Sequence, residues 1–306
     1  MIPFRVPVAL LAAALMLTLG LRAAKATESP SYTAYFQGKY LTALKLAEAE
    51  AAQGSREAYT LMGEIYSEGL GVAIDLNKAT DAYAKAADLG DPNAQFSLGT
   101  MVAEGRGMKK NPRIAADLFE KAAQSGHASA QYNLALVYLN GNGRPVSEEK
   151  AAEWMQKAAT QGHAPAEYDL GAFYQFGRGV QIDKAKAAEW TGKAADAGLS
   201  DAQVEYGVML FKGQGVAVDE AKAAKLFRLA AEQGNPIAQN RLARLYANGV
   251  VVKADPVQAA KWHLLARDAG VSDFSLDIVL AKLTKEQRAA AEQAAEDWRN
   301  GRLGKD

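Results

Sequence analysis

The stretch GQGVAVDEAKAAKLFRLAAEQG, from Gly213 to Gly234, decides the fold because the chain contains a near copy of it. The copy, GRGVQIDKAKAAEWTGKAADAG, runs from Gly177 to Gly198 and lies 36 residues earlier. Similarity within one chain at a fixed period of roughly 20 to 50 residues is typical of repeat arrays. The two copies therefore predict a protein that uses one structural unit many times.

Glycines carry the same period along most of the chain. A first column recurs every 36 residues, at Gly54, Gly90, Gly126, Gly162, Gly198, Gly234 and Gly270. A second column follows 15 residues after each of the first six, at Gly69, Gly105, Gly141, Gly177, Gly213 and Gly249. In five units another glycine follows two positions later, whereas the sixth unit has Val251 there. This register predicts six full units.

Each unit is predicted to form two helices joined by a glycine turn. In the first half, apolar residues such as Ala130, Leu134 and Tyr138 recur at spacing four, which indicates a helix with one apolar side. Glycine then tolerates the positive φ that ends a helix. The second helix is predicted to begin after a column of favoured N-cap residues, namely Asp75, Asn111, Ser147, Asp183, Asp219 and Asp255.

The second helices carry two columns of alanine, which allow close helix packing. Larger residues in one register, Leu118, Trp154, Trp190, Leu226 and Trp262, are predicted to fill the core between them. A lone helix pair cannot bury its apolar side, so successive pairs must stack. The predicted fold is therefore all-α, an α/α solenoid (superhelix) of 36-residue helix-turn-helix repeats.

The stretch AQYNLALVYLNGNGRPVSEEKAAEWMQKAATQGH, from Ala130 to His163, resembles the Sel1-like repeat family, a relative of the tetratricopeptide repeats. We predict six such repeats over residues 57–272, with the boundaries 57–92, 93–128, 129–164, 165–200, 201–236 and 237–272. Residues 27–56 are expected to form an N-terminal half repeat that acts as a cap. Some secreted members of the family carry a disulfide in each helix pair, but this chain has no cysteine.

The periodic pattern stops after Gly270. Thr284 is followed three residues later by Gln287, a capping-box pattern before a helix rich in alanine and glutamate. Arrays need an atypical element over their last apolar face, so residues 273–306 are predicted to form a C-terminal capping helix and tail. A partner-binding tail is the alternative, and self-association of the array as a homodimer stays open.

The N-terminal residues have the pattern of an export signal. Arg5 gives a positive start, residues 6–21 are apolar, and the small residues Ala24 and Ala26 precede an expected cleavage site after Ala26. The apolar run is short for a membrane span, which takes about 20 residues. We therefore expect a cleaved signal peptide over residues 1–26 rather than an anchor. For a bacterial source the mature chain is then periplasmic or secreted, with no membrane attachment.

Composition and motifs argue against several kinds of chemistry. The 306 residues include 35 basic and 35 acidic side chains, so no basic excess points to nucleic acid. The absence of cysteine excludes disulfides and thiolate metal sites. The glycine turns do not continue as phosphate-binding loops, and no GxSxG or HExxH pattern occurs. We expect no catalytic residues, no metal and no cofactor, and therefore no enzyme.

The three histidines do not suggest a metal site. His127 and His163 hold the same register in neighbouring units, on the order of 10 Å apart by helix packing distances. The equivalent positions contain Asp91, Leu199 and Asn235, so a turn or capping role is expected for both histidines. His263 lies far along the array from them.

Positions that change from copy to copy are the candidates for binding. Seven residues after each first-column glycine stand Leu61, Ser97, Asn133, Asp169, Glu205 and Arg241, and three residues further stand Glu64, Thr100, Leu136, Ala172, Val208 and Arg244. One helical turn separates the two sets, so they share a face. Phe176 and Lys212 stand out four residues further on. The resemblance implies that the first helices line a concave side. The candidate partner-binding residues are Asn133, Leu136, Asp169, Phe176, Glu205, Lys212, Arg241 and Arg244.

The expected function is that of a non-enzymatic scaffold or adaptor of the cell envelope, which binds a protein or peptide along the concave face. Regulation of a membrane sensor or of an envelope assembly system is a narrower alternative. An enzyme or binder that acts on cell-wall peptide or glycan is an alternative of another class. A glycan site would need exposed aromatic residues, for which only Phe176 and Phe211 are candidates.

Overall fold

The computed structural model describes residues 29–303, so the predicted signal peptide lies outside the described residues. Within that range every regular element is a helix, and none is a strand. The fold is an all-α solenoid, as the period predicts. The first helices of the six repeats are α4 (Arg56–Glu68), α6 (Pro92–Glu104), α8 (Ala128–Asn140), α10 (Ala164–Phe176), α12 (Ser200–Lys212) and α14 (Pro236–Asn248). The second helices are α5 (Leu76–Asp88), α7 (Pro112–Gln124), α9 (Glu148–Ala159), α11 (Lys184–Asp196), α13 (Glu220–Glu232) and α15 (Pro256–Asp268).

The helix boundaries follow the predicted caps. Every residue of the predicted N-cap column accepts a hydrogen bond from a backbone amide in the first turn of a second helix. Each first helix ends at a second-column glycine in the left-handed region, with φ between 64° and 81°. Both helix starts and helix stops are therefore confirmed, because both depend on single residues and local hydrogen bonds.

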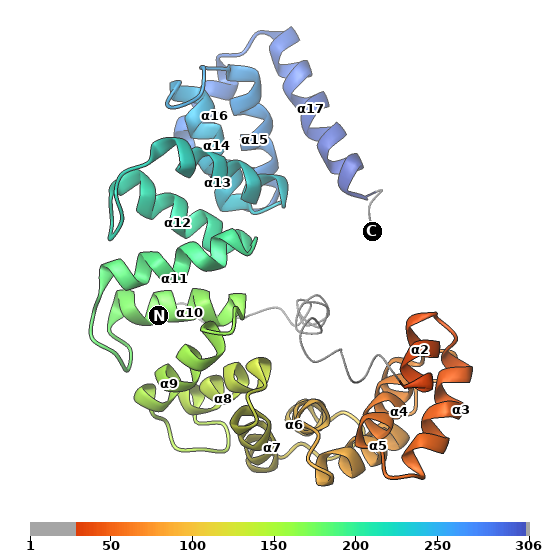
Figure 1. Cartoon of the computed structure of the whole chain (residues 1–306). Coiled ribbons are helices and arrows are strands. Elements are labelled where there is room, and N and C mark those ends of the chain that lie inside the picture. Colours follow the sequence, from red (N-terminus) through yellow and green to blue (C-terminus); the bar gives the residue numbers. More distant parts are fainter. Residues whose placement is uncertain (1–28, 304–306) are drawn as a thin grey trace. The chain divides into compact units, whose positions relative to one another are not determined.

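The chain divides into two compact units. One extends to Val137 and includes Gly141–Pro145, and the other contains Tyr138–Asn140 and the chain from Val146 onward. In the first unit, α2 (Pro30–Phe36) packs on α3 (Tyr40–Ala51), and consecutive helices then pack in order from α3 to α7. In the second unit, consecutive helices pack in order from α9 to α15 (Figure 1). The alanine columns are buried in both units, as predicted.

The glycine two positions after each helix stop fixes how one repeat meets the repeat before it. A methyl group on Gly107 would lie 2.7 Å from the carbonyl oxygen of Leu76, the first residue of α5. The three equivalent glycines lie even closer to the first residue of the preceding second helix, so that an added carbon would overlap its carbonyl oxygen. These pairs are Gly143 with Pro112, Gly179 with Glu148, and Gly215 with Lys184. In these four repeats the loop therefore seats on the preceding helix only because the residue at this position has no side chain.

Two helices follow the last repeat. The first is α16 (Phe274–Ala281), a short helix that was not predicted as separate from the cap, and the second is α17 (Lys285–Leu303). The capping box is confirmed, because the Gln287 amide donates to Thr284 Oγ1 over 3.2 Å and the Thr284 amide donates to Gln287 Oε1 over 3.1 Å. Helix α17 packs on α15 and buries Ala291 and Ala295 (Figure 1).

Candidate functional site

The candidate residues of the second unit lie on three successive first helices. Asp169 is on α10, Glu205 is on α12, and Arg241 and Arg244 are on α14. We call these four residues the first-helix face. A direct link between two of the helices is visible, because the Tyr168 hydroxyl on α10 donates to Glu205 Oε2 over 3.3 Å. Along this face the charge changes from acidic on α10 and α12 to basic on α14.

The acidic end of the face is half-buried. Asp169 and Glu205 are both partly shielded from solvent. Burial, followed by the charges of Glu205 and Asp201, raises the pKa of Tyr168 well above its usual range. The hydroxyl of Tyr168 therefore remains protonated at neutral pH and is held as a donor to the Glu205 carboxylate.

Arg241 at the basic end is half-buried and has no acidic partner among the described residues. Its Nε atom is shielded from solvent and makes no hydrogen bond. The guanidinium lies 5.7 Å from the ring centroid of Phe227, which compensates part of its lost hydration. Burial, and then the neighbouring charge of Arg244, lower the pKa of Arg241. This cation is thus partly dehydrated and keeps capacity to bind a carboxylate.

Arg244 differs from Arg241, although only one turn separates them. Its Nε donates to Asp273 Oδ2 over 2.6 Å, and Asn240 donates to the same oxygen over 2.9 Å. The Asp273 side chain is 2% exposed, whereas that of Arg244 is 58% exposed. Arg244 therefore joins the last repeat to the segment that leads into α16. Arg244 is one of the predicted binding residues, whereas Asp273 was not predicted, although an aspartate directly before a helix is a cap signal.

Two further candidates lie at the ends of the first helices. Phe176 is the last residue of α10 and is 66% exposed, and Lys212 is the exposed last residue of α12. Neither side chain is packed into the core of the second unit. Both are available to a ligand that contacts the helix ends.

The remaining two candidates belong to the first unit. Asn133 and Leu136 on α8 are half-buried. Asn133 Nδ2 donates to the carbonyl of Ser129 over 2.9 Å within its own helix. This bond reduces the capacity of Asn133 to donate to a partner, while its side-chain oxygen still accepts.

The equivalent register in the first repeat holds a half-buried carboxylate. Glu64 on α4 accepts a hydrogen bond from the Tyr35 hydroxyl over 2.5 Å. Burial raises the pKa of Glu64 despite that bond. The first helices therefore carry different chemistry from repeat to repeat at equivalent positions, as the sequence comparison indicates.

Two histidines are confirmed as caps. His127 Nδ1 accepts from the Ala130 amide over 3.1 Å, and His163 Nδ1 accepts from the Ala166 amide over 3.3 Å. The third, His263, is fully buried and contacts Asp277 Oδ1 through Nε2 over 2.7 Å. Over residues 29–303 no group of three or more acidic or histidine side chains is arranged to hold a metal ion.

Two surface cavities lie in the second unit, and neither is lined by any of the eight candidate residues. One has a volume of about 480 Å³ and lies beside the loop after α14, and the other, of about 530 Å³, lies between α11 and α13. These two cavities are therefore separate from the candidate residues. In the described part of the chain no helix has the length and apolar character of a membrane span.

Comparisons with known proteins agree with the repeat architecture. The Sel1 repeat family model matches six consecutive segments, 56–91, 92–127, 128–163, 164–199, 200–235 and 236–271. The crystal structure of a Sel1 repeat protein from Oxalobacter formigenes is similar at 29% identity, with a TM-score of 0.68, and the match covers 79% of this chain and 97% of that one. The protective antigen c5321 of uropathogenic Escherichia coli, which displays an SLR fold, is also 29% identical, with a TM-score of 0.56 and a match over 88% of this chain and 67% of that one. No protein of curated function matches the chain.

Proposed function

The chain belongs to the Sel1 repeat family, and from that premise we propose that it is a non-enzymatic scaffold whose first-helix face binds a protein or peptide partner. Proteins with Sel1 repeats are generally protein-interaction scaffolds. The use of Asp169, Glu205 and Arg241 for binding is proposed from the geometry of the face.

The change of charge along the first-helix face carries the proposal. Its acidic and basic ends occupy equivalent positions in successive repeats, while the caps and glycines around them repeat. Arg241 in particular is a half-buried cation without an acidic partner in the described chain, an arrangement that costs free energy in the unbound protein. A partner carboxylate that pairs with Arg241 offsets this cost, since hydrogen bonds between charged groups are among the stronger ones.

The proposed location is the cell envelope. The observation that favours it is the export-signal pattern of residues 1–26, with its apolar run and the small residues before the expected cleavage site. Under this proposal the partner is an envelope protein, and regulation of a membrane sensor or an assembly system is a narrower form of the same function. Mass spectrometry of the N-terminus after expression in the native host tests the cleavage directly.

The test of binding is capture from the native envelope fraction, followed by titration of the purified partner. The bait is the full chain with a C-terminal tag, beside a face variant in which three residues of the first-helix face, namely Asp169, Glu205 and Arg241, and the candidate residue Asn133 on α8 are changed to alanine. A control variant changes four exposed residues of the second helices with matched charges, namely Gln124, Glu153, Glu189 and Lys225.

We expect the wild type and the control to bind one partner with the same dissociation constant, and the face variant to bind at least about tenfold more weakly. Circular dichroism and urea unfolding establish that all three proteins are folded. Equal affinity of the face variant contradicts the assignment of the face. Capture of nothing by any bait contradicts the scaffold proposal and favours a glycan or small-molecule ligand.

A further inference from the structure

The sixth repeat departs from the other repeats in the loop after α14 and in the first turn of α15. Its loop contains Val251 where the others have glycine, and Gln258 stands where four of the five others have lysine. The cavity of about 480 Å³ lies beside this same loop. Because the five sibling repeats show what the scaffold needs, a local set of changes in one repeat indicates a local role.

Val251 changes how the loop seats on the helix before it. It is the only non-glycine residue in the described chain with a positive φ, at 65°, and as a β-branched residue it is strained there. In the preceding four repeats a glycine at this position lies against the first carbonyl of the previous second helix. Val251 has a side chain and cannot repeat that contact without displacing the loop from α13. Strained residues of this kind concentrate at binding sites and switch regions.

Tyr246 beside the loop lacks the cation that covers its siblings. A lysine ammonium lies 5.1 Å from the ring of Tyr66, 5.2 Å from that of Tyr138 and 5.1 Å from that of Tyr174. The equivalent of these lysines in the sixth repeat is Gln258, and no cation lies over the ring of Tyr246 among the described residues. The tyrosine therefore keeps one side of its ring for another group and lines the cavity.

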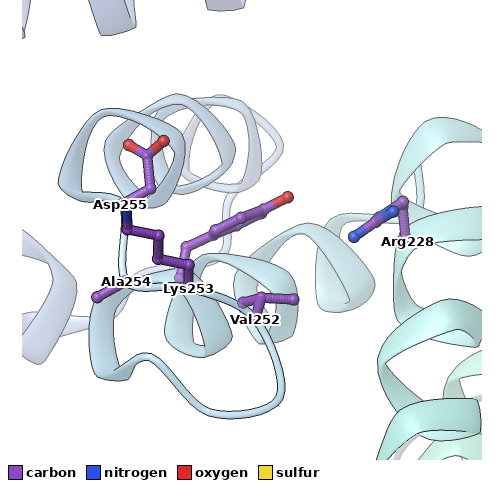
Figure 2. A pocket seen from close by; sticks show the side chains of 6 residues that line it. Arg228, Val252, Lys253, Ala254 and Asp255 are labelled. Carbon is purple, nitrogen blue, oxygen red and sulfur yellow. The ribbon is translucent and has the colours of Figure 1, made fainter.

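Arg228 reaches the cavity from the neighbouring helix α13. Its equivalent two repeats earlier is Gln156, whose side-chain oxygen accepts a hydrogen bond from the Tyr174 hydroxyl over 3.2 Å and so joins two repeats. Where the fifth repeat meets the sixth, the residue in this position is an exposed arginine with no ion pair in the described chain. Figure 2 shows the Arg228 side chain directed toward Val252, whereas the Lys253 side chain extends away from Arg228 toward Asp255.

The charge around the cavity is positive. Arg228 and Lys253 supply two cations, and the one acid in the lining, Asp255, accepts hydrogen bonds from the Val257 and Gln258 amides as the cap of α15. The Asp255 carboxylate thus serves the positive end of a helix. Tyr246, Val252 and Ala254 provide apolar surface between the two cations.

We propose that this cavity, the sixth-loop site, binds an acidic segment of a protein partner, with a carboxylate beside Arg228 and an apolar side chain against Tyr246 and Val252. A peptide combines these two features. The positive charge of Arg228 and Lys253 attracts an acidic side chain, and the apolar surface of Tyr246 and Val252 favours a bulky side chain next to it. The statement that the segment belongs to a protein partner rests on the proposed function. The site itself contains none of the residues of the first-helix face, so the two can fail independently.

Amide chemical shifts of the full-length protein test the site directly. The probe is the pentapeptide Gly-Glu-Phe-Glu-Gly, acetylated and amidated, and the comparison peptide has lysine in place of both glutamates. We expect saturable shifts of the amides of residues 250–254 with the acidic peptide at a dissociation constant of about 1 mM or tighter. The lysine peptide should leave these amides unchanged, and added salt should weaken binding of the acidic peptide.

Two variants restore the sibling residues and so avoid loss of fold. Arg228→Gln introduces the residue of the third repeat, and Gln258→Lys introduces the lysine that covers the tyrosine ring in three siblings. Arg228→Gln should weaken the acidic peptide at least about fivefold, because it removes the cation that pairs with the carboxylate. Gln258→Lys should instead remove the contribution of the phenylalanine, because the lysine covers the Tyr246 ring while its charge keeps the attraction for the glutamates. The control Lys184→Gln removes an exposed cation far from the cavity and should bind like the wild type.

The proposal is overturned if the wild type shows no saturable shifts up to 10 mM peptide, taken as roughly the limit of a specific contact. Equal binding of both peptides, or unchanged binding in Arg228→Gln, overturns it as well. The two proposals can also be told apart. If the Arg228→Gln variant loses the peptide but still captures the envelope partner, the partner binds through the first-helix face and not through the sixth-loop site.

Discussion

Arg244 on α14 and Asp273 before α16 form an ion pair of unequal exposure, with 2.6 Å between Nε and Oδ2. The aspartate is nearly fully buried and also accepts from the Ser275 amide as the cap of α16. Burial alone would raise the pKa of Asp273, but the hydrogen bonds from Arg244 and Asn240 outweigh it and hold the pKa below its usual range. The pair thus joins the repeats to the helices that close the array.

Removal of Arg244 should weaken this end of the protein. Arg244→Met leaves the buried Asp273 carboxylate with fewer donors, and we expect the free energy of unfolding to fall by about 1–3 kcal/mol at pH 7. Because the pKa of the folded carboxyl is depressed, the stabilisation is present above the unfolded value of about 3.9 and is lost as the pH falls through the folded value. Urea unfolding at a series of pH values measures this, and a variant as stable as the wild type at pH 7 would contradict the role of the pair.

The same substitution at Arg241, one turn away, should reduce binding rather than stability. Arg241→Met removes a half-buried cation with no acidic partner, so we expect the free energy of unfolding to change by less than about 1 kcal/mol. Binding of the captured partner should fall instead. A stability loss equal to that of Arg244→Met would show that Arg241 is structural, and its assignment to the binding face would fail.

The ionised side chain of Glu64 should make the protein less stable at neutral pH than at acidic pH. Its pKa is raised by burial, so the folded state binds a proton more tightly than the unfolded state does. The stability of the wild type should therefore fall as the pH rises through the interval between the unfolded and folded pKa values. Glu64→Gln keeps an acceptor for Tyr35 and should be more stable than the wild type at pH 7. The difference should disappear below about pH 4, near the unfolded pKa of glutamate. A constant difference over this range would exclude titration of Glu64 as its cause.

Two glycines of the fourth repeat separate the effect of backbone conformation from that of contact. Gly179 and Gly198 have φ values of 63° and 92°, but only Gly179 lies against another backbone, that of Glu148. Gly198→Ala should cost about 1–2 kcal/mol from the left-handed conformation alone. Gly179→Ala should cost at least about 2 kcal/mol more, because the loop must move off α9. Thermal and urea unfolding compare the two variants, and equal costs would mean that the loop seats without this contact.

Val251 offers the reverse experiment. Val251→Gly relieves a strained β-branched residue, which offsets the entropy that glycine adds to the unfolded chain. We expect its free energy of unfolding to lie within about 1 kcal/mol of the wild type. The neighbouring Val250→Gly gains no such relief and should be less stable than Val251→Gly. If the two variants lose the same amount, strain at Val251 is not significant.

Local chemistry explains which features could be predicted from the sequence. The caps at Asp75 and its equivalents and the glycine stops depend on one side chain and its neighbouring amides, so their positions follow directly from the register. The pair of Arg244 and Asp273 crosses from the periodic part into the aperiodic end, where no register indicates which residues meet. The sequence shows glutamine at position 258, where four other repeats have lysine. The role of this change depends on Arg228, which lies on a helix of the preceding repeat, so the sequence alone does not connect the two.

The contact between each loop glycine and the preceding helix has a consequence for how such a chain can change length. Because Gly179 and Gly215 must each meet a carbonyl 31 residues earlier, an insertion between the two positions separates them and opens the joint. A duplication of one whole 36-residue unit preserves every such joint on both sides. The array can therefore grow or shrink in whole modules while tolerating few insertions within them, and a longer or shorter homologue is expected to differ by complete repeats.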